Sequence, residues 1–224
     1  FPWLFPWCTI CAPDPMSNRA WAIVPPRFAS ERPHPYCWHV DVPDAPSFLN
    51  SHLEKLGEAA RRGSPPLAWP ALVTVSPEGR PDARTVVLRE FDGQIARLFT
   101  DARSRKVRDL LHCPLAVLHF LDPGALLQIR LYGVTEVNQQ DAVADTYWAG
   151  FREKHQREYQ PAAPPGSPME GPRTPLNPRM GAANFAVVTL SVTGIDILQV
   201  GREDHLRFHY ELGETGWTGS RVVP

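Results

Sequence analysis

The spacing of hydrophobic residues predicts one amphipathic helix followed by a series of short strands. From Asp44 to the run RRGSPP (61–66), apolar residues recur every three or four positions, and Asp44 or Ser47 can accept the first free N–H groups of a helix. Further on, apolar and β-branched residues form short runs between proline, glycine and aspartate, as in strands and their turns. The predicted strands cover residues 67–75, 83–91, 95–100, 115–121, 126–137, 185–192, 195–200, 206–212 and 217–222.

Two more helices are predicted between these strands. The run DARSRKVRDLLHCP (101–114) has apolar residues at helical spacing and a strongly basic first turn, and Asp101 or Ser104 can begin it. Residues 139–159 form the other helix. The segment 161–178 holds seven prolines, which exclude regular structure and predict a long loop that can cover a site.

This order of elements predicts a mainly β (α+β) fold with an antiparallel barrel and flanking helices, because a parallel sheet would alternate strands with helices. Along 126–137, apolar residues alternate with polar ones, so Gln128 and Arg130 are expected on a polar face of the sheet. Residues 1–45 are rich in proline and tryptophan and show no period. We therefore expect an irregular arm over 1–45 and one folded domain over 46–224.

Composition excludes several classes of function. The 23 basic and 24 acidic residues leave a net charge of -1, so no overall field favours nucleic acid or an anionic membrane. No apolar run is long enough for a membrane span, and the aromatic start lacks the order of a signal peptide. The four cysteines are too few for a disulfide scaffold. These features predict a cytoplasmic protein that binds neither nucleic acid nor membrane.

A cluster of cations lies around the start of the second predicted helix. Arg84 is on a strand, and the helix opens with Arg103, Ser104, Arg105 and Lys106. The first N–H groups of a helix lack partners and the helix dipole is positive at that end, so hydroxyl, guanidinium and ammonium groups there can bind a phosphate. The same spacing is also typical of a solvated basic helix face. The residues alone leave both interpretations open.

Four short blocks of sequence resemble the FMN-binding blocks of pyridoxamine 5′-phosphate oxidase and its relatives, in the same order. They are RTVVLR (84–89), FTDARSRK (99–106), QIRLYG (128–133) and the C-terminal HLRFHY (205–210) with WTGSRVVP (217–224). The likeness covers residues 67–224. Four ordered blocks are much more specific than any one of them.

The resemblance implies an antiparallel split β-barrel that binds FMN, and a homodimer with two FMN sites between its subunits. The helix start would hold the FMN phosphate, the first block would line the ribityl chain and ring, and Gln128 with Arg207 would approach the ring edge. The cofactor-binding residues implied in this way are Arg84, Thr85, Val86, Val87, Leu88, Phe99, Thr100, Ser104, Arg105, Lys106, Gln128 and Arg207.

The substrate side of the resemblance is less complete. Arg89 stands where the oxidase has a lysine, and Tyr147 and Arg152 are five residues apart where the family has four. The histidine of the family's R-L-H-D-R motif remains as His205, but Glu203 stands where a cation should meet the substrate phosphate. The resemblance implies Arg89, Tyr147 and Arg152 as substrate contacts and His205 as catalytic residue, in a flavin-dependent oxidoreductase whose small-molecule substrate is unassigned.

Two alternatives remain. Split barrels can also hold flavin or haem without catalysing a reaction, since a fold does not fix a function. Cys8 and Cys11 with His34, Cys37 and His39 carry the thiolate and imidazole groups that suit zinc. A lone CxxC without a second pair at standard spacing is a weak signal, and no metal site is expected.

Overall fold

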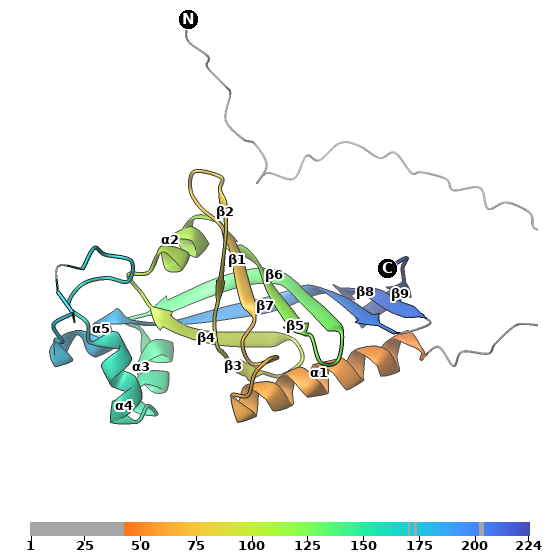
Figure 1. The fold of residues 1–224 in the computed structure, drawn as a ribbon, viewed down its shortest axis with the longest axis horizontal. Helices are drawn as coiled ribbons and strands as arrows, with labels where there is room; N and C mark the ends of the chain where they lie inside the picture. The colour runs from red at the N-terminus through yellow and green to blue at the C-terminus, as the bar shows by residue number, and fades with distance from the viewer. Residues whose placement is uncertain (1–42, 170, 173, 202–203) are drawn as a thin grey trace, which may run out of the picture. The chain divides into compact units, whose positions relative to one another are not determined.

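The computed structural model describes residues 43–169, 171–172, 174–201 and 204–224 (Figure 1). The cysteines and histidines considered for zinc lie outside these residues, as does Glu203. The division into an arm over 1–45 and a domain over 46–224 stays a prediction. Within the described ranges, no helix has the length and apolar character needed to cross a membrane, and no group of side chains suits a metal ion.

Helix α1 (Ala45–Arg62) begins and ends where the sequence signals lie. The Asp44 carboxylate accepts a hydrogen bond from the Ser47 N–H at 2.9 Å and so satisfies one of the free donors of the first turn. Gly63 ends the helix with a φ of 64°, a left-handed conformation that glycine adopts without strain. The buried face of α1 packs against strand β3 and the barrel core.

Nine strands of the described chain form one antiparallel sheet. Seven strands follow one another in the order β2-β1-β5-β6-β7-β4-β3. Outside this order, β8 pairs with β7, and β9 pairs with β8. The first half of β7 pairs with β4, and its second half pairs with β8 on the same edge. The strands are β1 (Ala71–Val75), β2 (Pro81–Thr85), β3 (Leu88–Phe91), β4 (Ile95–Asp101), β5 (Leu115–Asp122), β6 (Leu127–Gln139), β7 (Phe185–Val200), β8 (His205–Gly213) and β9 (Gly216–Arg221).

The barrel core is filled by one face of these strands. Alternate residues of β5, β6 and β8 are buried, β7 is buried on both faces over 185–188 and 194–197, and α1 covers part of the same core. The largest fully buried side chains include Phe120, Leu118, Ile129, Leu131, Leu190 and Tyr210. The predicted mainly β architecture with flanking helices is confirmed.

Two strand predictions were wrong in detail. The predicted strand 83–91 is two strands, because Val86 and Leu88 bond to the carbonyls of Pro70 and Ala68 instead of continuing the ladder. The predicted strands 185–192 and 195–200 are the single strand β7, whose register with β6 shifts near Gly133. A Cβ at Gly133 would collide with the backbone carbonyl of Ser191, so glycine is required for this close approach.

The predicted helix 139–159 was also wrong as one element. It is broken at Gly150 into α3 (Ala142–Ala149), α4 (Glu153–Gln156) and the 3₁₀ turn η1 (Arg157–Tyr159). Aromatic side chains of α3 (Trp148), of the link after it (Phe151) and of η1 (Tyr159) pack around Phe185 at the start of β7. The remaining elements are α2 (Arg105–His112), η2 (Pro178–Met180) and α5 (Gly181–Asn184).

Candidate functional site

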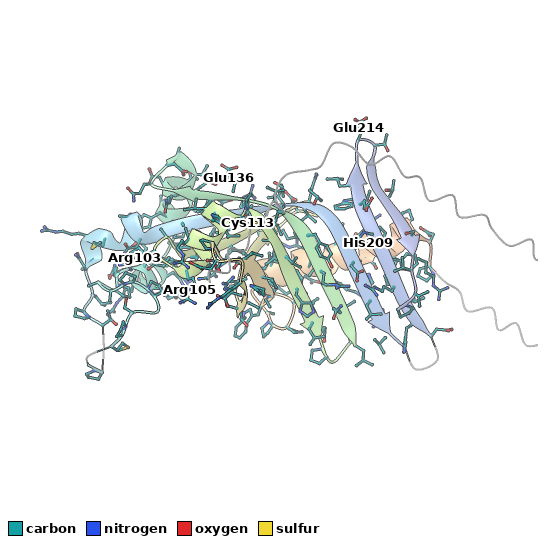
Figure 2. The ribbon with its side chains drawn as sticks, turned by 90° about the horizontal axis from the view of Figure 1, so that it is seen from above. Arg103, Arg105, Cys113, Glu136, His209 and Glu214 are labelled. Atoms are coloured by element: carbon teal, nitrogen blue, oxygen red, sulfur yellow. The ribbon has the colours of Figure 1, made fainter. Side chains whose placement is uncertain are left out.

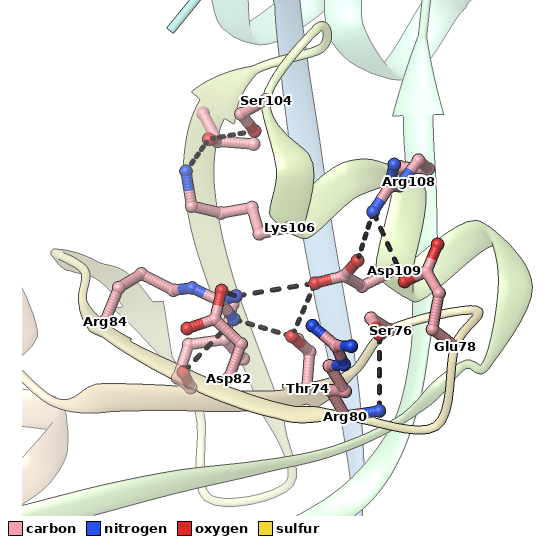
Figure 3. Close-up of polar contacts among 12 residues, drawn as sticks. Thr74, Ser76, Glu78, Arg80, Asp82, Arg84, Ser104, Lys106, Arg108 and Asp109 are labelled. Atoms are coloured by element: carbon pink, nitrogen blue, oxygen red, sulfur yellow. Dashed lines mark hydrogen bonds and ion pairs between the residues drawn. The ribbon is translucent and has the colours of Figure 1, made fainter. Parts of the chain in front are cut away.

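A small polar cradle lies where β4 ends and α2 begins. The Lys106 Nζ donates a hydrogen bond to the Thr100 hydroxyl at 3.0 Å, and the Ser104 hydroxyl lies 3.5 Å from the same oxygen (Figure 3). Thr100 and Ser104 are buried, and Lys106 is half-buried. Strand and helix therefore bring one ammonium and two hydroxyl groups together.

Backbone donors add to this cradle. Ser104 stands at the N-cap of α2, and its hydroxyl does not cap the helix. The N–H groups of Arg105 and Lys106, in the first turn, find no acceptor among the residues that the structure describes. Unpaired N–H groups at a helix start, together with the positive end of the helix dipole, favour an anion at this position.

The electrostatic state of Lys106 agrees with an anion site. Burial lowers the pKa of Lys106, the charge of Arg84 lowers it further, and Asp101 opposes the shift. Within the described chain, no carboxylate lies within ion-pair distance of the ammonium group. A half-buried cation without a counter-ion is stabilised by an anionic ligand.

The cradle opens into a pocket of about 780 Å³. Thr100, Asp101 and Lys106 line one side, Tyr159 lines another, and described residues of the proline-rich loop (161, 163–169, 171, 174 and 175) form the rest of the wall. Burial raises the pKa of Tyr159 to about 12, so its hydroxyl stays protonated at neutral pH. The predicted loop over 161–178 is thus a wall of the pocket.

Arg103 has a different place from the rest of the basic run. Its guanidinium bonds Asp101 through two nitrogens, at 3.0 and 2.7 Å, and donates to the carbonyl oxygens of Pro161 and Ala162 at 3.0 and 3.2 Å. The sequence grouped Arg103 with the phosphate-binding cations, and this role stays a prediction. Arg103 ties the loop to the end of β4.

Arg84 and Arg105 make other contacts. Arg84 donates to the Thr74 hydroxyl at 2.7 Å and lies 2.6 and 3.4 Å from the carboxylates of Asp82 and Asp109 (Figure 3). Arg105 lines a second hollow, of about 430 Å³, with Arg80 and Arg108. Consecutive residues of a helix point about 100° apart, which separates Arg105 from Lys106.

The block 84–89 contributes mainly framework. Leu88 is fully buried and offers no surface to a ligand, whereas Val86 and Val87 are partly exposed between β2 and β3. Thr85 ends β2 and is exposed. Phe99, from the second block, packs in the aromatic cluster beside Phe185.

Gln128 and Arg207 lie in one row across the sheet. Gln128 is opposite Leu198, and Leu198 is opposite Arg207, so the three side chains share a face of β6, β7 and β8. Thr100 is opposite Ala186, twelve residues before Leu198 on β7. At about 3.3 Å per residue, the row and the cradle are separated by up to roughly 40 Å in one chain. Figure 2 shows Arg103 and His209 near opposite ends of the sheet.

Of the residues implied as substrate contacts, Arg89 and Tyr147 both lie against the Phe99 ring, and the Arg152 side chain is exposed. Arg89 lies over the Phe99 ring at 5.8 Å, and its buried Nε lacks an acceptor among the described residues. The Tyr147 hydroxyl donates to Glu90 at 2.8 Å. Burial is the main cause that raises the pKa of Tyr147, and this hydrogen bond is the second. Arg152 is exposed at the start of α4.

His205 begins β8 on the same face as Arg207, because alternate residues of a strand share a face. Its side chain is exposed and makes no hydrogen bond or ion pair with the described residues. Its catalytic role therefore stays a prediction.

Sequence reasoning missed two buried carboxylates next to the predicted cations. Asp109 is fully buried behind Arg84, and Asp196 is 4% exposed beside Arg207. The signal for Asp196 was present, since a lone acid within the apolar run GIDIL needs a partner. Asp109 resembled an ordinary polar position of an amphipathic helix.

The sheet order, the helix on β3 and the paired strands of this chain form a split β-barrel. The chain belongs to the pyridoxamine 5′-phosphate oxidase family, whose model matches residues 65–180.

Similar proteins support both statements. A pyridoxine/pyridoxamine 5′-phosphate oxidase of Azorhizobium caulinodans is 32% identical over 169 residues, covering 68% of this chain and 78% of the relative. A pyridoxamine 5′-phosphate oxidase-related, FMN-binding protein of Nostoc punctiforme has a similar structure, with a TM-score of 0.62 at 22% identity, covering 82% of this chain and all of that one. PhzG of Burkholderia lata, solved with tetrahydrophenazine-1-carboxylic acid, has a TM-score of 0.63 at 20% identity, covering 82% and 95%.

Proposed function

We propose that this protein binds FMN and acts as a flavin-dependent oxidoreductase, with the FMN phosphate in the cradle at the start of α2. The observation that carries the proposal is the half-buried Lys106 ammonium, whose hydrogen bond to Thr100 is its sole polar contact within the described residues. Ser104 and the free N–H groups of the first turn add donors. Membership of the family makes the phosphate of FMN the fitting anion.

The remaining cofactor residues would act on the ring. When bound, FMN supplies hydride and electron transfer at its isoalloxazine ring. Arg207 and Gln128 would face the ring edge, where a guanidinium favours the reduced, more negative form of the flavin. Phe99, Val86 and Val87 would line the pocket wall and exclude water.

The spacing of the two places along the sheet favours two copies of the chain. The Gln128–Arg207 row and the cradle are twelve residues of β7 apart, up to roughly 40 Å along a fully extended strand. At that spacing one FMN molecule would not reach both places within one chain. We infer a homodimer in which the phosphate contacts come from one subunit and the ring contacts from the other. Light scattering should give a dimer for the flavin-loaded protein, and a flavin-loaded monomer would contradict this inference.

A substrate other than a pyridoxal-type phosphate fits the described residues better. Tyr147 is held by Glu90, which also accepts a hydrogen bond from Arg97 at 3.0 Å. The Arg152 side chain is exposed. Arg89 remains as a cation on an aromatic wall, which suits a planar anionic small molecule. We infer an oxidoreductase acting on such a molecule.

The experiment compares FMN binding by the wild type, Lys106→Gln and Lys154→Gln. Lys154 is an exposed lysine without a side-chain contact in the described chain, so it controls for loss of charge. Loss of a charge-assisted contact should weaken FMN binding of Lys106→Gln by roughly 10- to 100-fold, corresponding to ~1.5–3 kcal/mol. Lys154→Gln should bind as the wild type does. Equal affinity of both variants would contradict the cradle, and a wild type that binds no FMN would contradict the function.

A further inference from the structure

A nearly buried carboxylate connects three strands on the face that carries Arg207. Asp196, in β7, receives the Arg130 Nη2 on its Oδ1 at 2.9 Å. Its Oδ2 accepts a hydrogen bond from the Arg207 Nε at 3.1 Å, the Arg207 Nη2 lies at ion-pair distance, also 3.1 Å, and the His209 Nδ1 lies 4.0 Å away. One carboxylate thus holds two arginines from the neighbouring strands.

Strand register explains this arrangement. Arg130 of β6, Asp196 of β7 and His209 of β8 are directly opposite one another, and Arg207 is two residues before His209 on the same face. The cluster is adjacent to the row that carries Gln128. Burial alone would raise the pKa of Asp196, but the hydrogen bonds and charges of Arg130 and Arg207 outweigh it and lower the pKa. Asp196 is therefore ionised at neutral pH.

The bonds to Asp196 restrict the direction in which Arg207 can act. Two of its three nitrogens face the carboxylate, so Nη1 is the nitrogen left for another group. Because the guanidinium is planar, fixing two of its nitrogens fixes the orientation of the whole group. Arg130 is itself fixed, because its Cζ lies 5.9 Å from the centre of the Tyr132 ring. Asp196 is thus held from the β6 side while it holds Arg207 on the β8 side.

We propose that Asp196 is a positioning residue of the flavin site, which fixes Arg207 so that one edge of its guanidinium meets the isoalloxazine ring. This inference rests on the proposed FMN function. The negative charge of Asp196 also reduces the net positive charge beside the ring, so it sets how strongly Arg207 favours reduced flavin. Asp196 acts through Arg207 and does not itself contact the cofactor.

A purely structural role gives different expectations. If Asp196 only joined β6 to β8, removing Arg130 would have the same effect on FMN as removing the carboxylate. If Asp196 positions Arg207, Arg130→Ala should keep FMN affinity within about twofold, because both contacts with Arg207 remain. Arg130→Ala is therefore the matched control.

A double-mutant cycle tests the inference with the full chain. We would measure FMN affinity and the midpoint potential of bound FMN in the wild type, Asp196→Asn, Arg207→Ala and the double variant. Asp196→Asn should weaken FMN binding about tenfold in the wild type and less than about twofold once Arg207 is absent. The potential should shift in Asp196→Asn and not shift further in the Arg207→Ala background, which a strand tie alone would not produce.

Each outcome has one meaning. Independent, additive effects of the two substitutions, or an Arg130→Ala variant that loses FMN as Asp196→Asn does, would overturn the positioning role while the FMN function stands. A wild type that binds no FMN would overturn the function instead. If Asp196→Asn does not fold, Asp196→Glu keeps the charge but displaces it by one methylene, and its effect on FMN affinity should likewise vanish in the Arg207→Ala background.

Discussion

Asp101 and Arg103 form a bidentate ion pair at the end of β4, with nitrogen–oxygen distances of 3.0 and 2.7 Å. The same guanidinium donates to the backbone of the proline-rich loop, at Pro161 and Ala162. The pair therefore fixes a wall of the pocket from the protein side, and the wall does not depend on a ligand for its position.

Arg103→Ala should accelerate the release of FMN more than it slows binding, because the loop loses its attachment to β4. The variant should also lose about 1–2 kcal/mol of unfolding free energy, since several hydrogen bonds of a mostly buried arginine are removed. Flavin fluorescence after dilution gives the release rate. Arg179→Ala, at an exposed arginine near the end of the same loop, is the control and should leave the rate unchanged. Equal release rates in both variants would show that Arg103 does not hold the loop.

FMN affinity should fall at alkaline pH. Burial lowers the pKa of Lys106 below the usual lysine value of about 10.4, and a bound phosphate needs the ammonium form. Affinity therefore decreases as pH rises through the lowered pKa. The stability of the protein without FMN depends on pH in the opposite direction. Between the lowered pKa of folded Lys106 and its usual value, the unfolded chain binds more protons than the folded one, so the free energy of unfolding rises with pH.

The measurement is FMN affinity against pH for the wild type and Lys106→Arg. Arginine keeps its charge throughout this range, and titration of the flavin itself affects both proteins equally. The alkaline loss should be smaller in Lys106→Arg. Two parallel curves would exclude titration of Lys106 as the cause.

Asp109→Asn should destabilise the fold more than Asp82→Asn, although both carboxylates pair with Arg84. Asp109 is fully buried and accepts a hydrogen bond from Thr74 at 3.0 Å, whereas 43% of the Asp82 side chain is exposed. We expect a loss of about 1–3 kcal/mol for Asp109→Asn, because a buried group loses its charge-assisted contact, and below about 1 kcal/mol for Asp82→Asn. Denaturant unfolding of both variants measures the two losses of unfolding free energy. A larger loss for Asp82→Asn would contradict the assignment of Asp109 as the inner partner of Arg84.

Pyridoxamine 5′-phosphate should be oxidised poorly even when FMN is bound. The Tyr147 hydroxyl donates to Glu90 and the Arg152 side chain is exposed, so we expect two of the contacts to a substrate phosphate to be lost. Each missing charge-assisted contact weakens binding by ~1.5–3 kcal/mol, or two to four decades together, roughly. The assay follows pyridoxal 5′-phosphate formation beside a competent oxidase at equal flavin content. Comparable turnover at micromolar substrate would restore the full oxidase assignment.

Much of the fold was predictable because local patterns and global architecture agree. Asp44, Ser47 and the glycine at 63 delimit α1, and strict alternation identified the polar face of β6. The errors share a physical cause. The register shift at Gly133, across which β7 continues as one strand, and the break of the helix at Gly150 depend on contacts with residues far along the chain, which no local window contains.

The candidate site divides in the same way. Ser104, Lys106 and Thr100 lie together because a strand end and a helix start are adjacent in sequence, and the blocks indicated them. The direction of Arg105 and the attachment of Arg103 depend on helix phase and on a loop about sixty residues away. The sequence grouped these basic residues by charge, whereas the backbone directs their side chains to different contacts.

Strand β7 also dictates the order in which this protein can fold. It is the last of the central strands to be synthesised, yet β6 and β4, made some fifty to ninety residues earlier, pair with it along their length. Until residues 185–200 are available, β4 has β3 as its sole partner among the described strands, and one edge of β6 is open. Pairing across such separations carries a large loop-closure entropy and is slow. A ribosome-bound chain ending before β7 would therefore expose unpaired strand edges, which favour aggregation until residues 185–200 emerge.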